Sequence, residues 1–335
     1  MRHTVFAGVT AGFMVAGTTS PMAADVKFMM DWAWQGPQSF ALLAQNSGCF
    51  EENGINITLD RGFGSGRTPV ELAAGTYQMG LGDINPTIKF RAENPDSDLI
   101  AVAVLADASP LVAVVRADSG IEKPSDLEGK SLAAPDFDAG RQLFPAFAAA
   151  TEIDASTIEW VSVKPELREP MLAQKQTDGI TGFVTSALPS LGALGVGEED
   201  LKVFRYKEYG VDLYSTSILT TKAFAEANPE AVKSVVACMI DGTKAMVADV
   251  DGAIAALKAH EPLTDVAGET GRLIMTIDEM ISTESARANG LSAVDMERLQ
   301  STIIMVENAY GLENTLQATD LYDPSFLPSE EDRKF

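Results

Sequence analysis

The sequence predicts an α/β fold in which two lobes, each built from alternating strands and helices, face one another across a ligand cleft. Between residues 26 and 83, strand-like and helical segments alternate, a pattern typical of a parallel sheet. Residues 111–213 repeat this arrangement. Aromatic, polar and glycine residues follow several predicted strands, and ligands of parallel sheets bind beyond the carboxyl ends of the strands.

Short apolar segments separated by glycine and proline define the first lobe. They predict strands at residues 26–31, 55–59, 77–81 and 99–105, and helices at residues 40–45, 67–75 and 85–92. Asn94-Pro95 ends the last of these helices, because the residue before a proline disfavours helical backbone angles. The expected order is strand and helix in strict alternation.

The second lobe follows the same logic. Its expected strands are residues 111–115, 131–134, 159–163, 179–184 and 202–205, and its helices are residues 141–150 and 166–174. Residues 213–220 are apolar and β-branched, which predicts a strand that returns to the first lobe.

The remainder of the chain is expected to be mostly helical. Asn228 is predicted to cap a helix that starts at Pro229, and apolar residues at 232, 235, 236, 239 and 240 recur at helical spacing, so one face is buried. Further helices are predicted at residues 249–259, 266–275, 277–288 and 293–310. The tail from Asp320 is rich in proline and charge, and we expect it to run over the surface.

The N-terminus predicts export. Arg2 and His3 precede an apolar run to Gly17, and small residues up to Ala24 follow, which is the pattern of a cleaved secretory signal spanning residues 1–24. The alternative is a buried N-terminal helix. The run is too short to span a bilayer.

The charge balance narrows the class of partner. The chain carries 48 Asp and Glu against 25 Lys and Arg, a net charge of −23. Such a surface repels nucleic acid and anionic lipid head groups. It leaves room for an anionic ligand, because the local field of a site can oppose the global charge.

The cysteines give no framework pattern. Cys49 and Cys238 lie in separate segments, and although an exported protein could oxidise them, both positions suit a small buried apolar residue. We therefore expect two unpaired, buried cysteines.

Catalytic and cofactor motifs are missing from the sequence. Apart from His3, the only histidine is His260, in a segment typical of a solvated helix end, so a Ser-His-Asp or Cys-His arrangement is poorly supported. Cys and His show no metal-ligand spacing, and the glycine-rich loop lacks the lysine of a Walker motif. We expect a binding protein without a catalytic residue, metal or cofactor.

The glycine-rich loop before the first lobe's second helix is the leading candidate for ligand contact. It contains Gly64, Ser65, Gly66 and Arg67. Glycines there allow backbone N–H groups at a helix start to approach a ligand, and Arg67 suits a carboxylate, sulfonate or phosphate. The alternative is a plain turn with an exposed arginine. In the second lobe, Gly140 and Arg141 repeat the device with Asp138 as the predicted N-cap, although Arg141 could instead be solvated or pair with an acid.

Aromatic and polar residues complete the candidate site. Trp32 and Trp34 lie in a loop after the first strand and could stack on a flat ligand, or one could anchor the loop to its own lobe. Asp83 and Asn85 could accept hydrogen bonds from ligand amino groups, although Asp83 could simply cap the next helix. Additional candidates follow strands or flank the connections between the lobes: Ser109, Phe183 and Tyr214.

Several of these segments together resemble the SsuA/THI5-like (NMT1/THI5-like) periplasmic substrate-binding proteins of ABC importers. That group includes binders of nitrate, alkanesulfonates, taurine and thiamine pyrimidine precursors. The matching segments are Asp31-Trp32 and residues 48–54, 64–66, 80–83, 123–130, 178–182 and 228–230, and they cover most of residues 25–250.

The resemblance implies a type II periplasmic-binding fold with two crossover strands. One lobe would comprise residues 25–110 and 214–335, and the other residues 111–213. Closure of the lobes would trap a small molecule and present a surface to an ABC permease of the inner membrane. The protein is expected in the periplasm as a monomer. Fungal pyrimidine synthases share the fold, but this chain lacks their cysteine-rich signature and a histidine near the site, so we expect no enzyme activity.

Two ligand classes are compatible with these residues. The tryptophans with Asp83 and Asn85 suit a planar, amine-bearing heterocycle such as a pyrimidine. The glycine loop with Arg67 suits a sulfonate, taurine or nitrate instead. The sequence favours the heterocycle, or a heterocycle that carries an anionic group.

Overall fold

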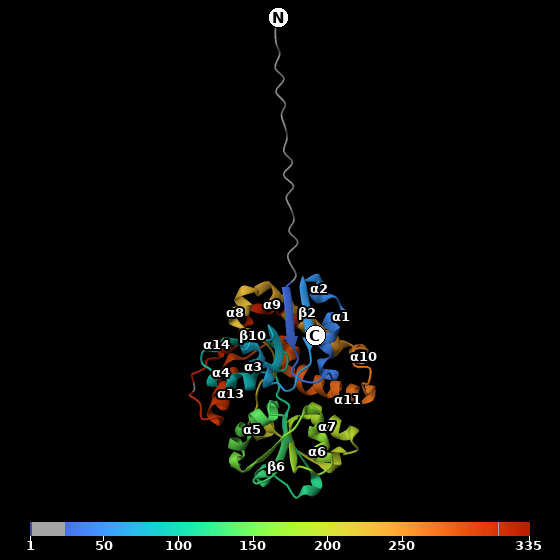
Figure 1. Cartoon of the computed structure of the whole chain (residues 1–335), viewed down its shortest axis with the longest axis vertical. Helices are drawn as coiled ribbons and strands as arrows, with labels where there is room; N and C mark the ends of the chain where they lie inside the picture. Colours follow the sequence, from blue (N-terminus) through green and yellow to red (C-terminus); the bar gives the residue numbers. More distant parts are fainter. Residues whose placement is uncertain (2–23, 314) are drawn as a thin grey trace.

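A computed structural model describes Met1, residues 24–313 and residues 315–335, so the predicted secretory signal lies almost wholly outside the described residues. Two five-stranded mixed sheets form two lobes, one above the other in Figure 1. Lobe 1 has the strand order β2-β1-β3-β10-β4, and lobe 2 has the order β7-β6-β8-β5-β9. The lobe 1 strands are β1 (Ala24–Met29), β2 (Ile55–Asp60), β3 (Met79–Asp83), β4 (Leu99–Val104) and β10 (Thr216–Thr221). The lobe 2 strands are β5 (Leu111–Arg116), β6 (Ser131–Ala134), β7 (Glu159–Ser162), β8 (Gly179–Phe183) and β9 (Leu201–Arg205).

Each sheet contains one antiparallel strand. In both sheets it is the strand that the chain forms directly after it crosses from the other lobe. β5 follows the first crossing of the chain and is antiparallel to β8 and β9. β10 follows the second crossing and is antiparallel to β3 and β4. The predicted fold class, two βα lobes with two crossovers, is confirmed. β4 and β5 are almost fully buried, in agreement with their uninterrupted apolar sequences.

Helices cover both sheets. In lobe 1 they are α1 (Ser39–Asn46), α2 (Cys49–Glu52), α3 (Arg67–Ala73), α4 (Ile84–Glu93), α8 (Lys222–Ala227), α9 (Pro229–Ala248), α10 (Val250–His260), α11 (Val266–Thr276), α12 (Glu284–Asn289), α13 (Met296–Ala309) and α14 (Ala318–Leu321). In lobe 2 they are α5 (Ala139–Ala150), α6 (Arg168–Ala173) and α7 (Val184–Ala193). Helix α9 starts at Pro229 as predicted and buries the apolar face predicted for it, but the Asn228 side chain makes no capping hydrogen bond.

The prediction omitted the short helices α2, α8 and α14, and two further segments also differ from it. Helix α7 was not predicted, because its sequence starts with β-branched Val184 without a side-chain cap and contains Pro189. The helix predicted at residues 277–288 is instead a π-helix, Ile277–Ile281, followed by a break and α12.

The lobes share part of the hydrophobic core. Ile88 of α4 and Ile303 of α13, both in lobe 1, belong to one buried cluster with Phe147 of α5 in lobe 2. In Figure 1, α13 lies above α5 on one side and α11 lies above α7 on the other. The lobes therefore touch on both flanks of the space between them.

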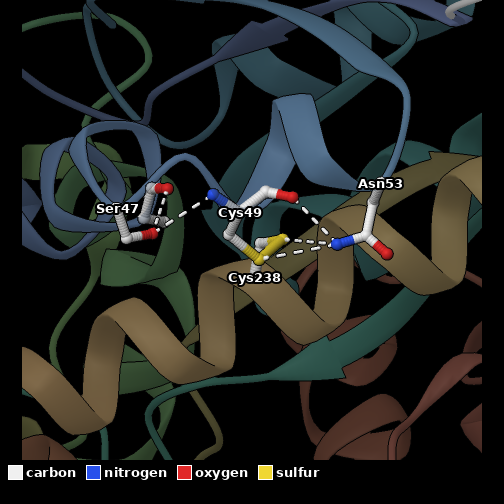
Figure 2. Close-up of a disulfide and its surroundings, with 5 residues drawn as sticks. Ser47, Cys49, Asn53 and Cys238 are labelled. Carbon is white, nitrogen blue, oxygen red and sulfur yellow. Dashed lines mark hydrogen bonds between the residues drawn. A yellow bond between two sulfur atoms is a disulfide. The ribbon is translucent and has the colours of Figure 1, made fainter.

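The prediction of two unpaired cysteines is wrong. Cys49 and Cys238 form a disulfide that joins α2 to α9, with their Cα atoms 5.8 Å apart (Figure 2). Asn53 contacts both sulfur atoms. The pairing escaped the sequence because 189 positions separate the two residues and only the packing of α2 on α9 brings them together.

The prediction of a surface-running tail is also wrong in part. Leu321 and Tyr322 are buried, and Phe326 is 8% exposed. Tyr322 forms a parallel bridge with Ala101 of β4, and the Asp323 N–H donates to the Ala101 carbonyl. The apolar residues of the tail are needed to cover β4, which is an edge strand.

Reduction of the disulfide should lower the stability of lobe 1. A cross-link that closes so long a loop restricts the unfolded chain, and its removal typically costs about 2–5 kcal/mol. We expect the urea midpoint of the wild-type protein to fall on reduction. The Cys49→Ser/Cys238→Ser variant should unfold at the urea midpoint of the reduced wild-type protein, and addition of reductant should not change its midpoint. Equal midpoints for the oxidised and reduced wild-type protein would contradict the prediction.

Candidate functional site

A pocket lies between the lobes, with about 770 Å³ of empty space when its open mouth is included. Its lobe 1 lining is Asp31, Trp32, Gln35, Pro37, Gln38, Phe40, Gly64, Ser65, Leu81, Thr216, Thr243, Met246, Arg272, Thr276, Met280 and Ile281. Its lobe 2 lining is Asp138, Ala139, Arg168, Phe183, Thr185 and Ser186. Leu105, in the first crossing, completes the wall. The lobe 1 strand ends therefore face the helix starts of lobe 2.

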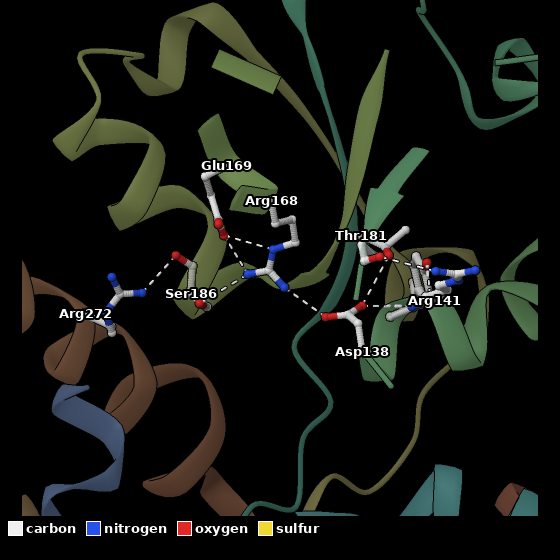
Figure 3. A network of polar contacts seen from close by, with 10 residues as sticks. Asp138, Arg141, Arg168, Glu169, Thr181, Ser186 and Arg272 are labelled. Atoms are coloured by element: carbon white, nitrogen blue, oxygen red, sulfur yellow. Dashed lines mark hydrogen bonds and ion pairs between the residues drawn. The ribbon is translucent and has the colours of Figure 1, made fainter. Parts of the chain in front are cut away.

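A buried arginine organises the lobe 2 wall. Arg168, 1% exposed, donates to Asp138 Oδ2 at 2.8 Å and to Glu169 Oε1 at 2.6 Å (Figure 3). Its guanidinium carbon lies 5.0 Å from the centre of the Trp32 ring, so the cation stacks on an indole of the other lobe. Glycine is required at position 182, because φ is 155° there and a Cβ would lie 2.4 Å from Arg168 Nη1.

The two carboxylates around Arg168 accept from different parts of its guanidinium: Glu169 accepts from Nε and Nη2, and Asp138 accepts from Nη1. Asp138 also accepts hydrogen bonds from the Arg141 N–H and the Thr181 hydroxyl. Burial raises the pKa of Asp138, and the charge of Arg168 opposes that rise. With Glu169 included, this group of three side chains carries a formal net charge of −1.

Asp31 is a second buried carboxylate, and it has no cation beside it. Its Oδ1 accepts from Gln38 Nε2 at 3.1 Å, and no ion pair to Asp31 is found within the described ranges. Burial raises the pKa of Asp31, and the hydrogen bond from Gln38 opposes this. Gln38 Oε1 is buried and has no hydrogen-bond partner among the described residues. The pocket wall thus holds one acceptor without a donor among the described residues, Gln38 Oε1, beside a buried carboxylate that has hydrogen-bond donors but no cation.

Asp83 lies beneath this wall, fully buried. It caps α4 by accepting from the Asn85 N–H, and it also accepts from the Asn85 side chain and the Ser215 hydroxyl. Burial raises its pKa to about 6, and the charge of Asp31 adds to the rise. The two aspartates therefore form a single electronegative region at the ends of β1 and β3.

The second arginine in the lining is also fully engaged. Arg272 of α11 donates to Glu269 in its own helix and to the Thr185 and Ser186 carbonyls of α7. It is 4% exposed. Both pocket arginines are therefore held by protein acceptors.

The pocket brings together five of the fourteen residues predicted for the site. They are Trp32, Gly64, Ser65, Asp138 and Phe183. The other nine lie outside its lining: Trp34, Gly66, Arg67, Asp83, Asn85, Ser109, Gly140, Arg141 and Tyr214.

Four of these nine have partners elsewhere in the protein. Arg67 pairs with Glu71 in its own helix, and Arg141 pairs with Asp136. The Trp34 ring packs edge-on against His260 at 4.6 Å. The buried Tyr214 hydroxyl accepts from the Asp295 N–H.

Four others are packed or hydrogen-bonded within the protein, and the ninth, Asp83, is the buried cap of α4 described above. Asn85 donates to Asp83 and to the Tyr214 carbonyl, and Ser109 is buried in the first crossing. The Gly66 N–H donates to the Phe137 carbonyl of lobe 2 at 3.0 Å. At Gly140 a Cβ would meet the Gly182 nitrogen at 2.5 Å, so this glycine is needed for packing.

Sequence reasoning did not select four polar residues that line the pocket: Asp31, Gln38, Arg168 and Arg272. Asp31 follows a strand and Arg168 follows the loop after β7, so position at a strand end was a usable signal for both. Nothing in the local sequence marks Arg272, which lies in the middle of an amphipathic helix.

Comparisons with known proteins agree with this geometry. The formylaminopyrimidine-binding protein of Halalkalibacterium halodurans is 23% identical over 306 residues, which cover 89% of each chain. Among solved structures, a Bordetella bronchiseptica protein superposes with a TM-score of 0.75 at 15% identity, over 90% of this chain and 95% of the other. The alkanesulfonate-binding protein SsuA of Xanthomonas axonopodis pv. citri, bound to MOPS, gives 0.70 at 17% identity, over 91% and 100%.

These structures show the same fold, that of periplasmic substrate-binding proteins. Fold alone is compatible with many functions. The family model described as NMT1/THI5 like matches residues 38–253, which is more than half of the chain and includes both lobes. The chain therefore belongs to the NMT1/THI5-like family.

Proposed function

We propose that this chain is the periplasmic substrate-binding protein of an ABC importer and that its ligand is a planar, amine-bearing heterocycle of the pyrimidine type. The protein would bind the ligand between its lobes and deliver it to a permease of the inner membrane, after removal of the N-terminal signal. A binding site shared by two lobes supports this role, since lobe closure reports occupancy to a partner. The name of the Halalkalibacterium relative points to the same ligand class.

One observation carries the choice of ligand: the pocket has buried acceptors and no free cation among the described residues. Arg168 and Arg272 are each paired with carboxylates, whereas Asp31 is unpaired. Gln38 Oε1 adds an unpaired acceptor beside Asp31. A buried carboxylate without a neighbouring cation is costly, and a ligand whose N–H groups reach both Asp31 and Gln38 Oε1 would lower that cost. An exocyclic amino group provides two such N–H donors.

The rest of the lining supports a flat, largely apolar ligand body. The indole of Trp32 borders the pocket, and the guanidinium of Arg168 lies over its ring. Phe40, Phe183 and Met280 supply apolar walls. Aromatic walls with a few polar groups are typical of sites for small heterocycles.

A sulfonate or similar anion is less well supported. Arg67, which the sequence suggested for that role, lies outside the lining and pairs with Glu71. An anion placed beside Asp31 and the Arg168 group would meet like charge at short range. An enzyme on this fold is also less well supported, because His260 packs on Trp34 and lies outside the pocket lining.

A thermal-shift panel should separate the two ligand classes. Aminopyrimidines, including formylaminopyrimidine, are expected to raise the Tm, since a ligand at about 100 times its Kd stabilises the folded state by about 2.7 kcal/mol. Taurine, nitrate and alkanesulfonates are expected to leave it unchanged. Stabilisation by taurine alone would reverse the assignment. Mass spectrometry of the released ligand should show it unaltered, as a carrier requires.

Two substitutions should distinguish recognition by Asp31 from recognition by charge at Arg67. Asp31→Asn removes the charged acceptor while keeping the side-chain shape, and we expect calorimetry to show aminopyrimidine affinity about 10- to 100-fold lower, since hydrogen bonds to charged groups contribute about 1.5–3 kcal/mol. Arg67→Ala should bind as the wild-type protein does. The opposite pattern, with Arg67→Ala weakened and Asp31→Asn unaffected, would place the ligand elsewhere.

A further inference from the structure

The loop that carries Gln38 is attached to helix α11. Residues 35–38 supply Gln35, Pro37 and Gln38 to the pocket lining. The Gly36 N–H donates to Glu269 Oε2 at 2.6 Å. A Cβ at Gly36 would lie 2.6 Å from the Glu269 carbonyl oxygen, so this backbone can approach α11 so closely only as glycine. The position of the ligand loop therefore depends on Glu269.

Glu269 is attached in turn to Arg272, and Arg272 reaches the other lobe. Arg272 Nε donates to the two Glu269 oxygens at 3.1 and 3.0 Å. Its Nη1 donates to the Thr185 and Ser186 carbonyls at 3.1 and 2.8 Å, and its Nη2 donates to Ser190 Oγ at 3.0 Å. Figure 3 shows Arg272 directed from α11 toward Ser186 of lobe 2. A single guanidinium thus holds an acid of one lobe and three acceptors of the other.

We propose that Glu269 and Arg272 are positioning residues that couple the ligand loop, residues 35–38, to helix α7 of lobe 2. The inference rests on the proposed binding function and deepens it, because it assigns the residues that link occupancy of the pocket to lobe closure. When the lobes are closed, Arg272 donates hydrogen bonds to α7 and to Glu269, and Glu269 accepts a hydrogen bond from the Gly36 N–H. When the lobes part, Arg272 loses its three lobe 2 acceptors, and Glu269 loses the cation that orients it.

Other ion pairs between the lobes lack this connection. Arg61 pairs with Glu166, but their side chains are 37% and 56% exposed, so water competes for the contact. Arg205 forms a two-pronged pair with Glu279, but neither residue contacts residues 35–38. Arg298 pairs with Asp212 of lobe 2, whose side chain is 65% exposed. The Glu269–Arg272 pair lies within α11, and among these ion pairs of the described residues it alone has hydrogen bonds to both α7 and the ligand loop.

The coupling predicts a kinetic signature. A ligand must enter while the lobes are apart and the Arg272 contacts are broken, so the association rate should not depend on them. Release requires that these contacts break, so the dissociation rate should. Weakening the pair should therefore raise the dissociation rate and loosen the ligand loop and α7 together.

The test compares Arg272→Lys, Glu269→Ala and Glu269→Gln with the control Arg91→Lys. Lysine keeps the positive charge at position 272, but its ammonium group has only three N–H donors and cannot donate to Glu269 and the three lobe 2 acceptors at once. Glutamine keeps an oxygen that can accept from the Gly36 N–H. Arg91 is a matched control, since its guanidinium donates to the Leu99 and Asp320 carbonyls within lobe 1 alone.

Stopped-flow measurements with formylaminopyrimidine as the probe should show dissociation about tenfold faster for Arg272→Lys and Glu269→Ala, because charge-assisted, multiply donating contacts are lost. Association should stay within about twofold of the wild type, as the Arg272 contacts are broken while the ligand enters. Glu269→Gln should recover part of the effect, and Arg91→Lys should bind as the wild type does. Without ligand, hydrogen exchange in peptides covering residues 35–40 and 184–190 should rise together in Glu269→Ala.

The proposal is overturned if Arg272→Lys and Glu269→Ala match Arg91→Lys in both measurements. It is equally overturned if exchange rises in α7 while residues 35–40 stay protected, because Arg272 would then be a simple lobe contact. The exchange measurement needs no ligand. It therefore decides the coupling even where no aminopyrimidine binds, an outcome that would count against the proposed ligand alone.

Discussion

The architecture depends on the exchange of one strand between the two sheets. β4 ends where the chain crosses to lobe 2, and β5 then runs antiparallel to β8. The return crossing ends in β10, which runs antiparallel to β3 and β4. Because both crossings leave and arrive at the carboxyl edges of the parallel strands, these two edges must face each other. The pocket between the lobes follows from that constraint.

Burial of charge determines what the pocket can bind. Arg168 and Arg272 sit deep between the lobes, where an unpaired guanidinium would be costly, and protein acceptors hold both. The acids outnumber them, and Asp31 keeps a carboxylate without a cation. Low exposure makes the Asp31 carboxylate costly without a cation, and the N–H donors of the ligand proposed above would offset this cost. Trp32 contributes to both effects, since it borders the pocket and stacks with Arg168.

Two aspartates illustrate how far sequence reasoning reaches into the site. Asp83 and Asp138 each follow a strand segment or loop and precede a helix, and both cap that helix as the sequence suggested. Asp138 lines the pocket, whereas Asp83 lies beneath it. The local signal is identical, and the difference arises from which elements pack over each carboxylate. Arg67 shows the reverse case, because its partner Glu71 lies one helical turn away and was visible in the sequence.

The sequence by itself determined the order of the strands and of most of the longer helices, the starts of α4, α5 and α9, and the family of the chain. These features depend on residues close together along the chain, such as an aspartate before a helix or a run of valines in a strand. Only the tertiary structure decided that Cys49 meets Cys238, that Arg168 stacks on Trp32, and that Arg272 bridges the lobes. Each of these contacts joins segments far apart in sequence. Their geometry therefore arises from the packing of whole elements, which a local pattern of residues does not encode.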